Sequence, residues 1–306
     1  MNFNLESEER CGYTVSQEMK KVWLAEIDLL QQLLKVCDKH HLRIWADGGT
    51  LLGAVRHHGF IPWDDDIDLC MPREDYDRLI ALGASAFNDP YFLQSAYSDQ
   101  GYSRGHAQLR NSMTAAIRLS DSYRPFNQGI FVDIFPLDAV PDDTQQLKTA
   151  LRSVRRTLRF LKAKDTQILM SGRWGLVFRK LRAQWVVSRK EWTTVFREAE
   201  DRLRTLGSAD SRYVAELAFS GDDILFERQI FEDTVWLPFE HITIPAPAGY
   251  DLMLRTQYGP DYMTPMHAPS YHGDMIMDTE RSYRDLLPEA RRQYRKSQLR
   301  KLFGKK

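Results

Sequence analysis

The sequence predicts an α/β fold in which a mixed sheet is flanked by helices and carries a helical insertion. Three observations lead to this prediction. Apolar residues recur with helical spacing over residues 14–40, and acidic and apolar residues alternate as in a strand from Trp63 to Met71. A second strand, apolar on both faces, runs from Gly129 to Asp138. Helices and strands that follow one another in this way typically form a sheet covered by helices.

Length and composition are those of a globular, soluble protein. The chain has 306 residues, of which 43% are hydrophobic and 27% are charged, so a sizeable core is expected. Because the formal net charge is zero, no nucleic-acid partner is expected. Three cysteines without metal-ligand spacing indicate a reducing compartment, and the polar, acidic N-terminus is unlike a secretory signal. No stretch reaches the roughly 18 apolar residues that a membrane span needs, so we expect a cytoplasmic protein.

The segment after the first helix has a pattern that can hold phosphate. Residues 42–46 are expected to form a short strand, a Gly-Gly-Thr sequence interrupts it, and residues 51–55 suit a helix. Glycines allow close approach of the backbone, and a helix N-terminus presents free N–H groups to an anion. An ordinary turn is the alternative for the glycines, and a solvated side chain is the alternative for the arginine that follows the helix. The candidate phosphate ligands are Gly48, Gly49, Thr50 and Arg56.

Four carboxylates crowd into five positions from Asp64 to Asp68. If this segment is a strand, Asp64, Asp66 and Asp68 share one face, because side chains alternate between the two faces. Three like charges on one face are destabilising unless a cation lies among them. A hard divalent cation with oxygen ligands, Mg²⁺ or Mn²⁺, is therefore expected.

Two alternatives apply to the same acidic residues. An acidic, solvent-exposed turn after Pro62 is one. A helix–loop–helix calcium loop is the other, but it requires glycine at the position of Leu69 and normally has Glu at the position of Asp75.

Asp133 lies within the second strand, with Ile, Phe and Val on both sides. A carboxylate in such surroundings must be paired or must bind metal. A structural salt bridge is the alternative to metal ligation. Asp138 lies beyond Pro136 and is expected to cap a turn. Residues 107–117 are expected to contain a further strand, with Arg110 as a polar member.

Residues 143–215 differ in character from the rest of the chain. Residues 148–190 contain 13 Lys or Arg and one acid, Asp165, and Trp174 and Trp185 lie among them. A solvated helical insertion is the simplest interpretation. The insertion can also contact an anionic membrane surface or hold a polyanionic acceptor.

These motifs together resemble the LicD family. The resemblance covers roughly residues 14–140 and 240–285. It rests on Gly48 to Arg56, Gly59 to Asp68, Met71 to Tyr76, Gly129 to Asp138, and the tail from Tyr258 to Pro265. The chain departs from the family pattern at Gln108, where the family usually has Lys two residues before its Arg, and at Pro260, which is an additional residue.

The resemblance implies a nucleotidyltransferase-type fold, shared with the fukutin-related sugar-phosphate transferases. It also implies transfer of phosphocholine from CDP-choline to a cell-surface glycan. In this fold a Gly-Gly-Ser/Thr turn and an acid-apolar-acid strand bind the metal and nucleotide, and a neighbouring strand supplies a third acid. The corresponding residues are Gly48, Gly49, Thr50, Asp66, Asp68 and Asp133, with Asp64 in the same pattern and Arg110 at the family's arginine.

We therefore expect a catalytic core over residues 1–142, a basic helical insertion over 143–215, and a C-terminal part, 216–306, that completes the core and ends in a basic tail. The expected reaction moves phosphocholine, or a similar phospho-alcohol, from a CDP-linked donor to a hydroxyl of a glycan or lipid-linked glycan. Asp66 and Asp68 would hold metal, and Asp133 would complete the site and is a candidate acceptor for the hydroxyl proton. A true nucleotidyltransferase and a non-catalytic glycan- or partner-binding descendant are the alternatives. Contact with the inner face of the cell membrane is expected to be peripheral.

Overall fold

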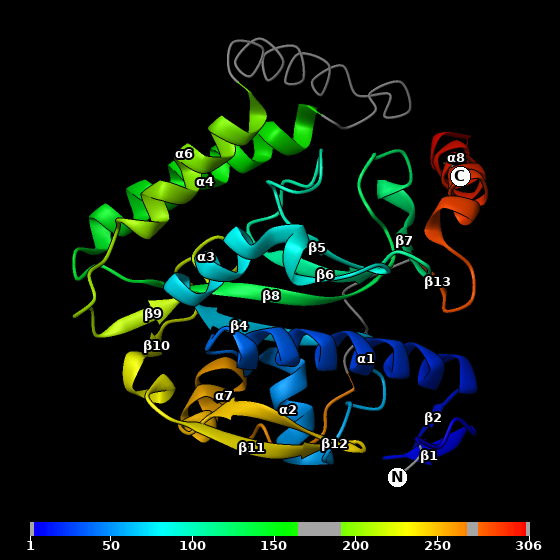
Figure 1. Cartoon of the computed structure of the whole chain (residues 1–306), viewed down its shortest axis with the longest axis horizontal. Helices are drawn as coiled ribbons and strands as arrows, with labels where there is room; N and C mark the ends of the chain where they lie inside the picture. The colour runs from blue at the N-terminus through cyan, green and yellow to red at the C-terminus, as the bar shows by residue number, and fades with distance from the viewer. Residues whose placement is uncertain (1–2, 165–190, 268–274, 304–306) are drawn as a thin grey trace.

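The structure, a computed structural model, describes residues 3–164, 191–267 and 275–303. A mixed sheet of seven strands lies at the centre of these residues (Figure 1). Its strands are β3 (Trp45–Ala46), β4 (Asp68–Pro72), β5 (Tyr91–Gln94), β6 (Ala107–Asn111), β8 (Ile130–Ala139), β9 (Tyr213–Ala215) and β10 (Phe226–Glu227). The strand order is β10-β9-β8-β4-β3, and β6 joins β8 to the edge strand β5.

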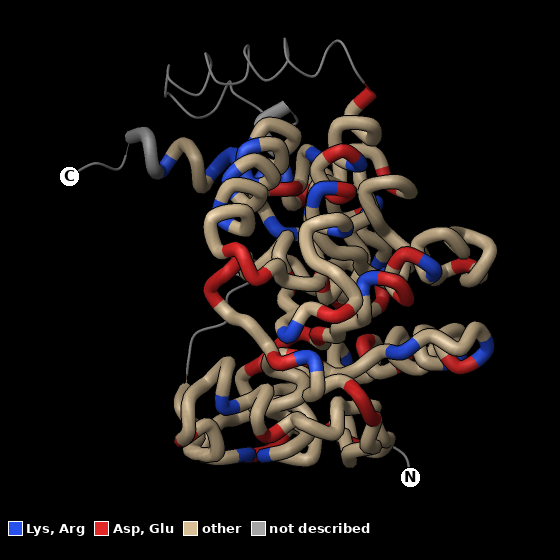
Figure 2. Tube along the Cα trace, turned by 90° about the vertical axis from the view of Figure 1, so that its left-hand side faces the viewer, with Lys and Arg blue, Asp and Glu red and all other residues tan. Residues whose placement is uncertain are grey.

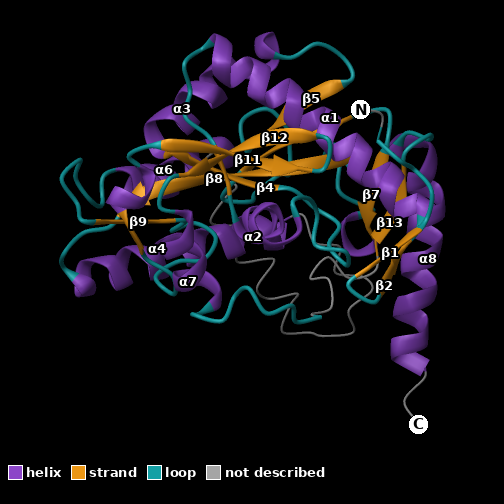
Figure 3. Ribbon diagram, turned by 90° about the horizontal axis from the view of Figure 1, so that it is seen from below, coloured by secondary structure: helices purple, strands orange, loops and turns teal. Residues whose placement is uncertain are grey.

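Strand β8 organises the sheet, since it pairs parallel to β4 and antiparallel to both β6 and β9. It is buried along nearly its whole length, which explains why its sequence is apolar on both faces. Helices α1 (Gln17–Lys39) and α3 (Arg73–Leu82) lie on one face of the sheet, and α2 (Gly48–His57) lies on the other (Figure 3). The predicted α/β fold with a mixed sheet is confirmed.

Smaller elements surround this centre. Helix α7 (Tyr250–Tyr258) and the hairpin of β11 (Thr234–Phe239) and β12 (Ile242–Pro247) pack against α2. Strands β1 (Glu8–Arg10) and β2 (Tyr13–Val15) form a hairpin before α1. Strand β7 (Ala115–Arg118) pairs with β13 (Met275–Asp278), and α8 (Tyr283–Phe303) packs beside β7. Short 3-10 helices span Gly83–Ala86, Leu119–Asp121 and Arg228–Phe231.

Helices α4 (Thr144–Lys164) and α6 (Trp192–Arg204) pack against each other at one end of the sheet (Figure 1). Both lie in the segment predicted as a helical insertion. Strand β9, near the end of that segment, instead extends the sheet. Trp174 and Trp185 lie outside the described residues.

Several predicted boundaries were wrong. The acidic strand begins only at Asp68, because the backbone before it forms a turn: Asp64 N donates to the Ile61 carbonyl, 2.9 Å away. The Asp64 carbonyl accepts from the Trp23 indole, at 2.9 Å, rather than from a strand. Helix α1 starts at Gln17 with Ser16 as its N-cap, since the preceding residues belong to β2.

The glycine pair was expected to separate a strand from a helix. In the structure it instead forms the first turn of α2. The segment 107–117 contains two strands, β6 and β7, and the segment before it includes β5. Asp138 does not cap a turn: it is fully buried in β8 and accepts two hydrogen bonds from Arg73, of 2.6 and 2.8 Å. The arginine begins α3, directly after the neighbouring strand β4, and no local pattern reveals this pair.

Candidate active site

The register of β4 and β8 brings acids from distant parts of the chain together. Asp68 is the direct partner of Asp133 across the parallel pair. Carboxylate oxygens of Asp66, Asp68 and Asp133 lie within 4.8 Å of one another, and Asp64, Asp65 and Asp66 form a second such group. The four predicted metal ligands thus lie in two overlapping groups, and Asp66 belongs to both.

The N-terminus of α2 lies directly against these acids. Thr50 Oγ1 accepts a hydrogen bond of 2.8 Å from the backbone N–H of Asp68. A Cβ on Gly49 would lie 2.4 Å from an Asp64 carboxylate oxygen, and one on Gly48 would lie 3.2 Å from Asp68. Gly48 also has φ +50°, a conformation that favours glycine. The glycines are therefore required by the close approach of backbone and carboxylates.

Helix α7 packs against α2 and contacts the N-terminus of that helix. Gln257 donates to the Asp47 carboxylate, which also caps α2 by accepting from Gly48 N. The Tyr258 hydroxyl lies near Gly48. Burial and the carboxylates of Asp47 and Asp68 raise the pKa of Tyr258, so the hydroxyl remains a proton donor in this environment.

The carboxylates of the site differ in their electrostatics. Burial raises the pKa of Asp66 and Asp68 well above the usual value, and the neighbouring acids raise it further. Burial also tends to raise the pKa of Asp133, but His106, Arg104 and Gln108 more than offset this and hold it below its usual value. Nε2 of His106 lies 3.0 Å from Asp133 Oδ1. Asp133 is therefore the carboxylate that the protein itself stabilises as an anion.

These residues fit a divalent metal ion. The donors are carboxylate oxygens, which Mg²⁺ and Mn²⁺ prefer. Asp66 and Asp68 repel each other and Asp133, and a cation held among them would remove that repulsion. Metal binding at these residues remains a prediction.

Arg110 is only 2% exposed, and each nitrogen of its guanidinium donates a hydrogen bond. It donates to Gln94 Oε1, to the Gly129 carbonyl and to Gln108 Oε1, each at 2.5 Å. Gln108 in turn donates to Asp133 Oδ1 at 2.6 Å. Arg110 thus orients Gln108 toward Asp133, and a direct phosphate contact would require some of these bonds to break.

Arg56 lies at the opposite end of α2 from the glycines. Its guanidinium donates to Nε2 of His57, to the Tyr262 carbonyl at 2.9 Å and to the Thr264 carbonyl at 3.4 Å. These bonds join α2 to the loop after α7. The structure therefore does not bring Arg56 together with the acids, and its predicted role in phosphate binding has no support from its position.

Several acids of the site were missed by the sequence analysis. Glu26 of α1 is 2% exposed, and burial together with Asp66, Asp65 and Asp64 raises its pKa well above the usual value. Glu216, after β9, has its pKa raised by burial and then by Asp47. Glu26 follows Trp23 by three residues on the apolar face of the helix, and this placement was the available signal. Nothing local distinguishes Glu216.

The fold and the site define an α/β protein with a carboxylate cluster beside a helix N-terminus, as expected for a protein that handles metal-bound phosphates. Comparison with known proteins agrees. Residues 41–164 match the family model described as LicD/FKTN/FKRP, nucleotidyltransferase domain. Residues 41–164 are therefore similar to the LicD-type nucleotidyltransferase domain, and the resemblance seen in the motifs is confirmed.

Individual relatives match over shorter regions. The chain is 30% identical over 152 residues to the lipopolysaccharide cholinephosphotransferase LicD of Haemophilus influenzae, a match that covers 48% of this chain and 56% of that protein. It is 56% identical over 46 residues to the human ribitol 5-phosphate transferase FKRP, covering 15% of this chain and 9% of that protein. An uncharacterized protein of Rickettsia prowazekii is 42% identical over 119 residues, 39% of this chain and 41% of that protein. The chain thus spans about half or less of the length of the relatives it matches.

Proposed function

We propose that this protein is a metal-dependent transferase that moves phosphocholine, or a similar phospho-alcohol, from a CDP-linked donor to a hydroxyl of a cell-surface glycan. One observation carries the proposal: carboxylates of Asp66, Asp68 and Asp133 meet beside the N-terminus of α2. Two named relatives support the reaction class, because one is a cholinephosphotransferase and the other a ribitol 5-phosphate transferase.

Each part of the site has a role in such a transfer. Phosphoryl transfer depends mainly on positioning and on neutralisation of charge. Asp66, Asp68 and Asp133 would hold Mg²⁺ or Mn²⁺, with Asp64 adjoining them, and metal bound there would polarise the transferred phosphoryl group. The backbone at Gly48, Gly49 and Thr50 would face the donor diphosphate. The lowered pKa of Asp133 favours a role as ligand over a role as proton acceptor.

The donor is tested by a thermal-shift screen with Mg²⁺. CDP-choline, CDP-glycerol, CDP-ribitol and ordinary nucleotides are compared, and a bound donor raises the melting temperature by mass action. We expect stabilisation by at least one CDP-alcohol, CDP-choline above all, beyond that given by CMP or ATP. Equal stabilisation by all nucleotides, or by none, would contradict a CDP-alcohol donor.

The reaction is tested by mass spectrometry of the product. Transfer of a phospho-alcohol adds phosphocholine or an equivalent group to the acceptor, whereas a true nucleotidyltransferase adds a nucleoside monophosphate. A non-catalytic binding protein adds neither. The retention of the whole acid set argues against the last alternative, since loss of catalysis usually removes metal ligands first.

A further inference from the structure

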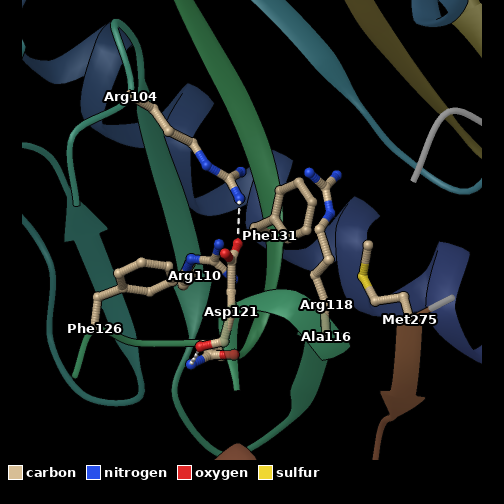
Figure 4. A pocket seen from close by; sticks show the side chains of 9 residues that line it. Arg104, Arg110, Ala116, Arg118, Asp121, Phe126, Phe131 and Met275 are labelled. Atoms are coloured by element: carbon tan, nitrogen blue, oxygen red, sulfur yellow. Dashed lines mark hydrogen bonds and ion pairs between the residues drawn. The ribbon is translucent and has the colours of Figure 1, made fainter. Parts of the chain in front are cut away.

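Figure 4 shows a pocket rich in arginine. Two of its arginines, Arg104 and Arg118, lie near enough to Asp133 of the acidic cluster for its charge to stabilise their charged forms. Its enclosed volume is about 10 Å³, room for roughly one water-sized atom, and it is partly open to solvent. Arg104, Arg110 and Arg118 line it, and Asp121 is the one acid among the residues that do so. This enclosed space is too small for a nucleotide, but an oxygen of a small anionic group could enter it from the open side.

The single acid does not balance these charges. Asp121 is shared between Arg104, at 3.3 Å, and Arg124, at 3.2 Å. Arg110 donates only to neutral groups. For Arg118, no hydrogen bond or ion pair joins the guanidinium to any residue in the described ranges, and its Nε is buried without a partner. A buried N–H without an acceptor is unfavourable, and an anion in the pocket would supply the acceptor.

Figure 4 shows the guanidinium groups of Arg104 and Arg118 on either side of the Phe131 ring. Arg104 comes from the loop before β6, and Arg118 comes from the end of β7. The ring lies 4.7 Å from the Arg110 guanidinium carbon. An oxyanion between the two outer arginines could accept hydrogen bonds from both, in the forked geometry that arginine offers to phosphate and carboxylate.

The pocket and the α2 N-terminus lie on opposite sides of the carboxylates. Phe131 precedes Asp133 by two residues on β8, so both side chains are on the same face. Arg110 on β6 is the strand partner of Phe131. On the other flank of β8, Asp68 of β4 pairs with Asp133 and contacts Thr50 of α2. Two anion-attracting positions therefore flank the proposed metal site.

We propose that the pocket of Arg104, Arg110 and Arg118 binds an anionic substituent, a phosphate or a carboxylate, on the acceptor glycan. This inference rests on the proposed function. It names the chemical class of the acceptor, the second substrate of the transfer. The donor diphosphate is expected at the N-terminus of α2, which leaves the pocket on the far side of the metal site for the acceptor. A choline group does not suit it, because a quaternary ammonium is recognised by aromatic faces and repelled by guanidinium groups.

Titration calorimetry with inorganic phosphate tests the pocket. The full chain is used at low salt with EDTA, so that no metal contributes a second phosphate site. Arg118→Gln should weaken phosphate binding at least about tenfold, as expected for loss of charge-assisted hydrogen bonds. Arg118→Lys should fall between Arg118→Gln and wild type. Arg212→Gln removes the same charge from an exposed pair with Glu227 and should leave the affinity unchanged.

The same proteins provide a check on folding. Because Arg118 has no partner among the described residues, Arg118→Gln should keep the wild-type melting temperature or raise it. Phosphate should raise the melting temperature of wild type and of Arg212→Gln, but not of Arg118→Gln. Equal phosphate affinity in wild type and Arg118→Gln, or no phosphate binding to either, would overturn the inference.

A second titration separates the acceptor from the donor. Phosphate is titrated into protein saturated with Mg²⁺ and a CDP-alcohol found by the donor screen. An unchanged phosphate affinity supports an acceptor site, whereas displacement of phosphate shows that the donor fills the pocket and overturns the assignment. If no CDP-alcohol binds, the proposed function fails, while the dependence of phosphate binding on Arg118 is still measured in the metal-free titration.

Discussion

Asp66 and Asp68 bear most of the electrostatic strain of the site. Their pKa values are raised well above the usual value by burial and by the acids beside them. Removing one of these charges relieves repulsion among the neighbouring acids. This distinguishes them from acids that hold the structure together.

Asp68→Asn and Asp66→Asn should each abolish transfer while the protein remains folded. In the absence of metal, both variants should melt no lower than wild type, since the lost charge was repelled by its neighbours. The stabilisation of wild type by Mg²⁺ should disappear in both. Near-normal turnover in either variant with Mg²⁺ supplied would rule out this role.

Asp133 and Asp138 provide a matched comparison, because both are buried acids of β8. Asp133→Asn should weaken Mg²⁺ binding in the presence of donor, and it should also lower stability, because His106 and Gln108 lose the carboxylate that they contact. Asp138→Asn removes one partner of a buried pair with Arg73 and should lower stability by about 3–5 kcal/mol. Urea unfolding and metal calorimetry on both variants check this. A destabilised Asp133→Asn with unchanged Mg²⁺ affinity would instead indicate a structural salt bridge.

Mg²⁺ affinity should rise with pH. Protons compete with metal at Asp66 and Asp68, whose folded-state pKa values are raised. Without metal, the free energy of unfolding should instead fall as pH rises. The stability contributed by protonated Asp66 and Asp68 is fully present below the unfolded pKa, about 3.9, and is lost as pH rises through their raised folded pKa values. Calorimetry and thermal melts from about pH 5 to 8 test both trends. A Mg²⁺ affinity independent of pH in that range would argue against these ligands.

At the scale of elements, α2 connects the fold to the site. Its first turn is formed by glycines that face carboxylates, and its last turn is joined through Arg56 to the loop after α7. Another network joins α6 to the core: Arg73 of α3 contacts both Asp138 of β8 and Glu200 of α6. The helical segment is therefore anchored to the same strand that carries Asp133.

Gly48→Ala and Gly83→Ala separate backbone strain from function. The two glycines have similar φ angles, +50° and +54°, but only Gly48 has a site residue near its added Cβ. Both substitutions should lower stability, by roughly 1–3 kcal/mol. Only Gly48→Ala should also weaken Mg²⁺ and donor binding, measured by calorimetry. Equal metal and donor affinity in the two variants would leave the glycine with a purely conformational role.

At the scale of the whole molecule, zero net charge conceals an uneven distribution. Figure 2 shows Lys and Arg recurring along the helices of the upper half. In α4, Lys148, Arg152, Arg156 and Arg159 are exposed and spaced by four, four and three residues, so they share one face. No helix in the described ranges is long and apolar enough to cross a bilayer.

We predict reversible binding of this basic face to anionic membranes. Each Lys or Arg near such a surface contributes about 1 kcal/mol. The full chain should co-sediment with vesicles containing phosphatidylserine at low salt, and not with neutral vesicles or at high salt. Changing the four exposed basic residues of α4 to Glu should abolish co-sedimentation, whereas Arg212→Glu should not. Absence of binding at low salt would leave α4 as an ordinary solvated helix.

The sequence by itself determined the elements whose signal is local. Helical spacing over α1, the apolar run of β8, and the alternation of Ile67, Leu69 and Met71 with acids reflect contacts that each element makes along its own length. The acidic and glycine motifs also pointed to the candidate site. Element limits were less certain, because Trp23 of α1 donates to the Asp64 carbonyl and the strand begins only at Asp68.

Only the tertiary structure decided how distant residues meet. The register of β4 and β8 places Asp68 opposite Asp133, and the pairing of β7 with β13 brings Arg118 beside Met275. The role of Arg110 depended on the partners that surround it once β6 is buried. Burial and long-range pairing set the charge state and freedom of a side chain, and neither is encoded in its neighbours along the chain. The arginine pocket is therefore visible only in the folded protein.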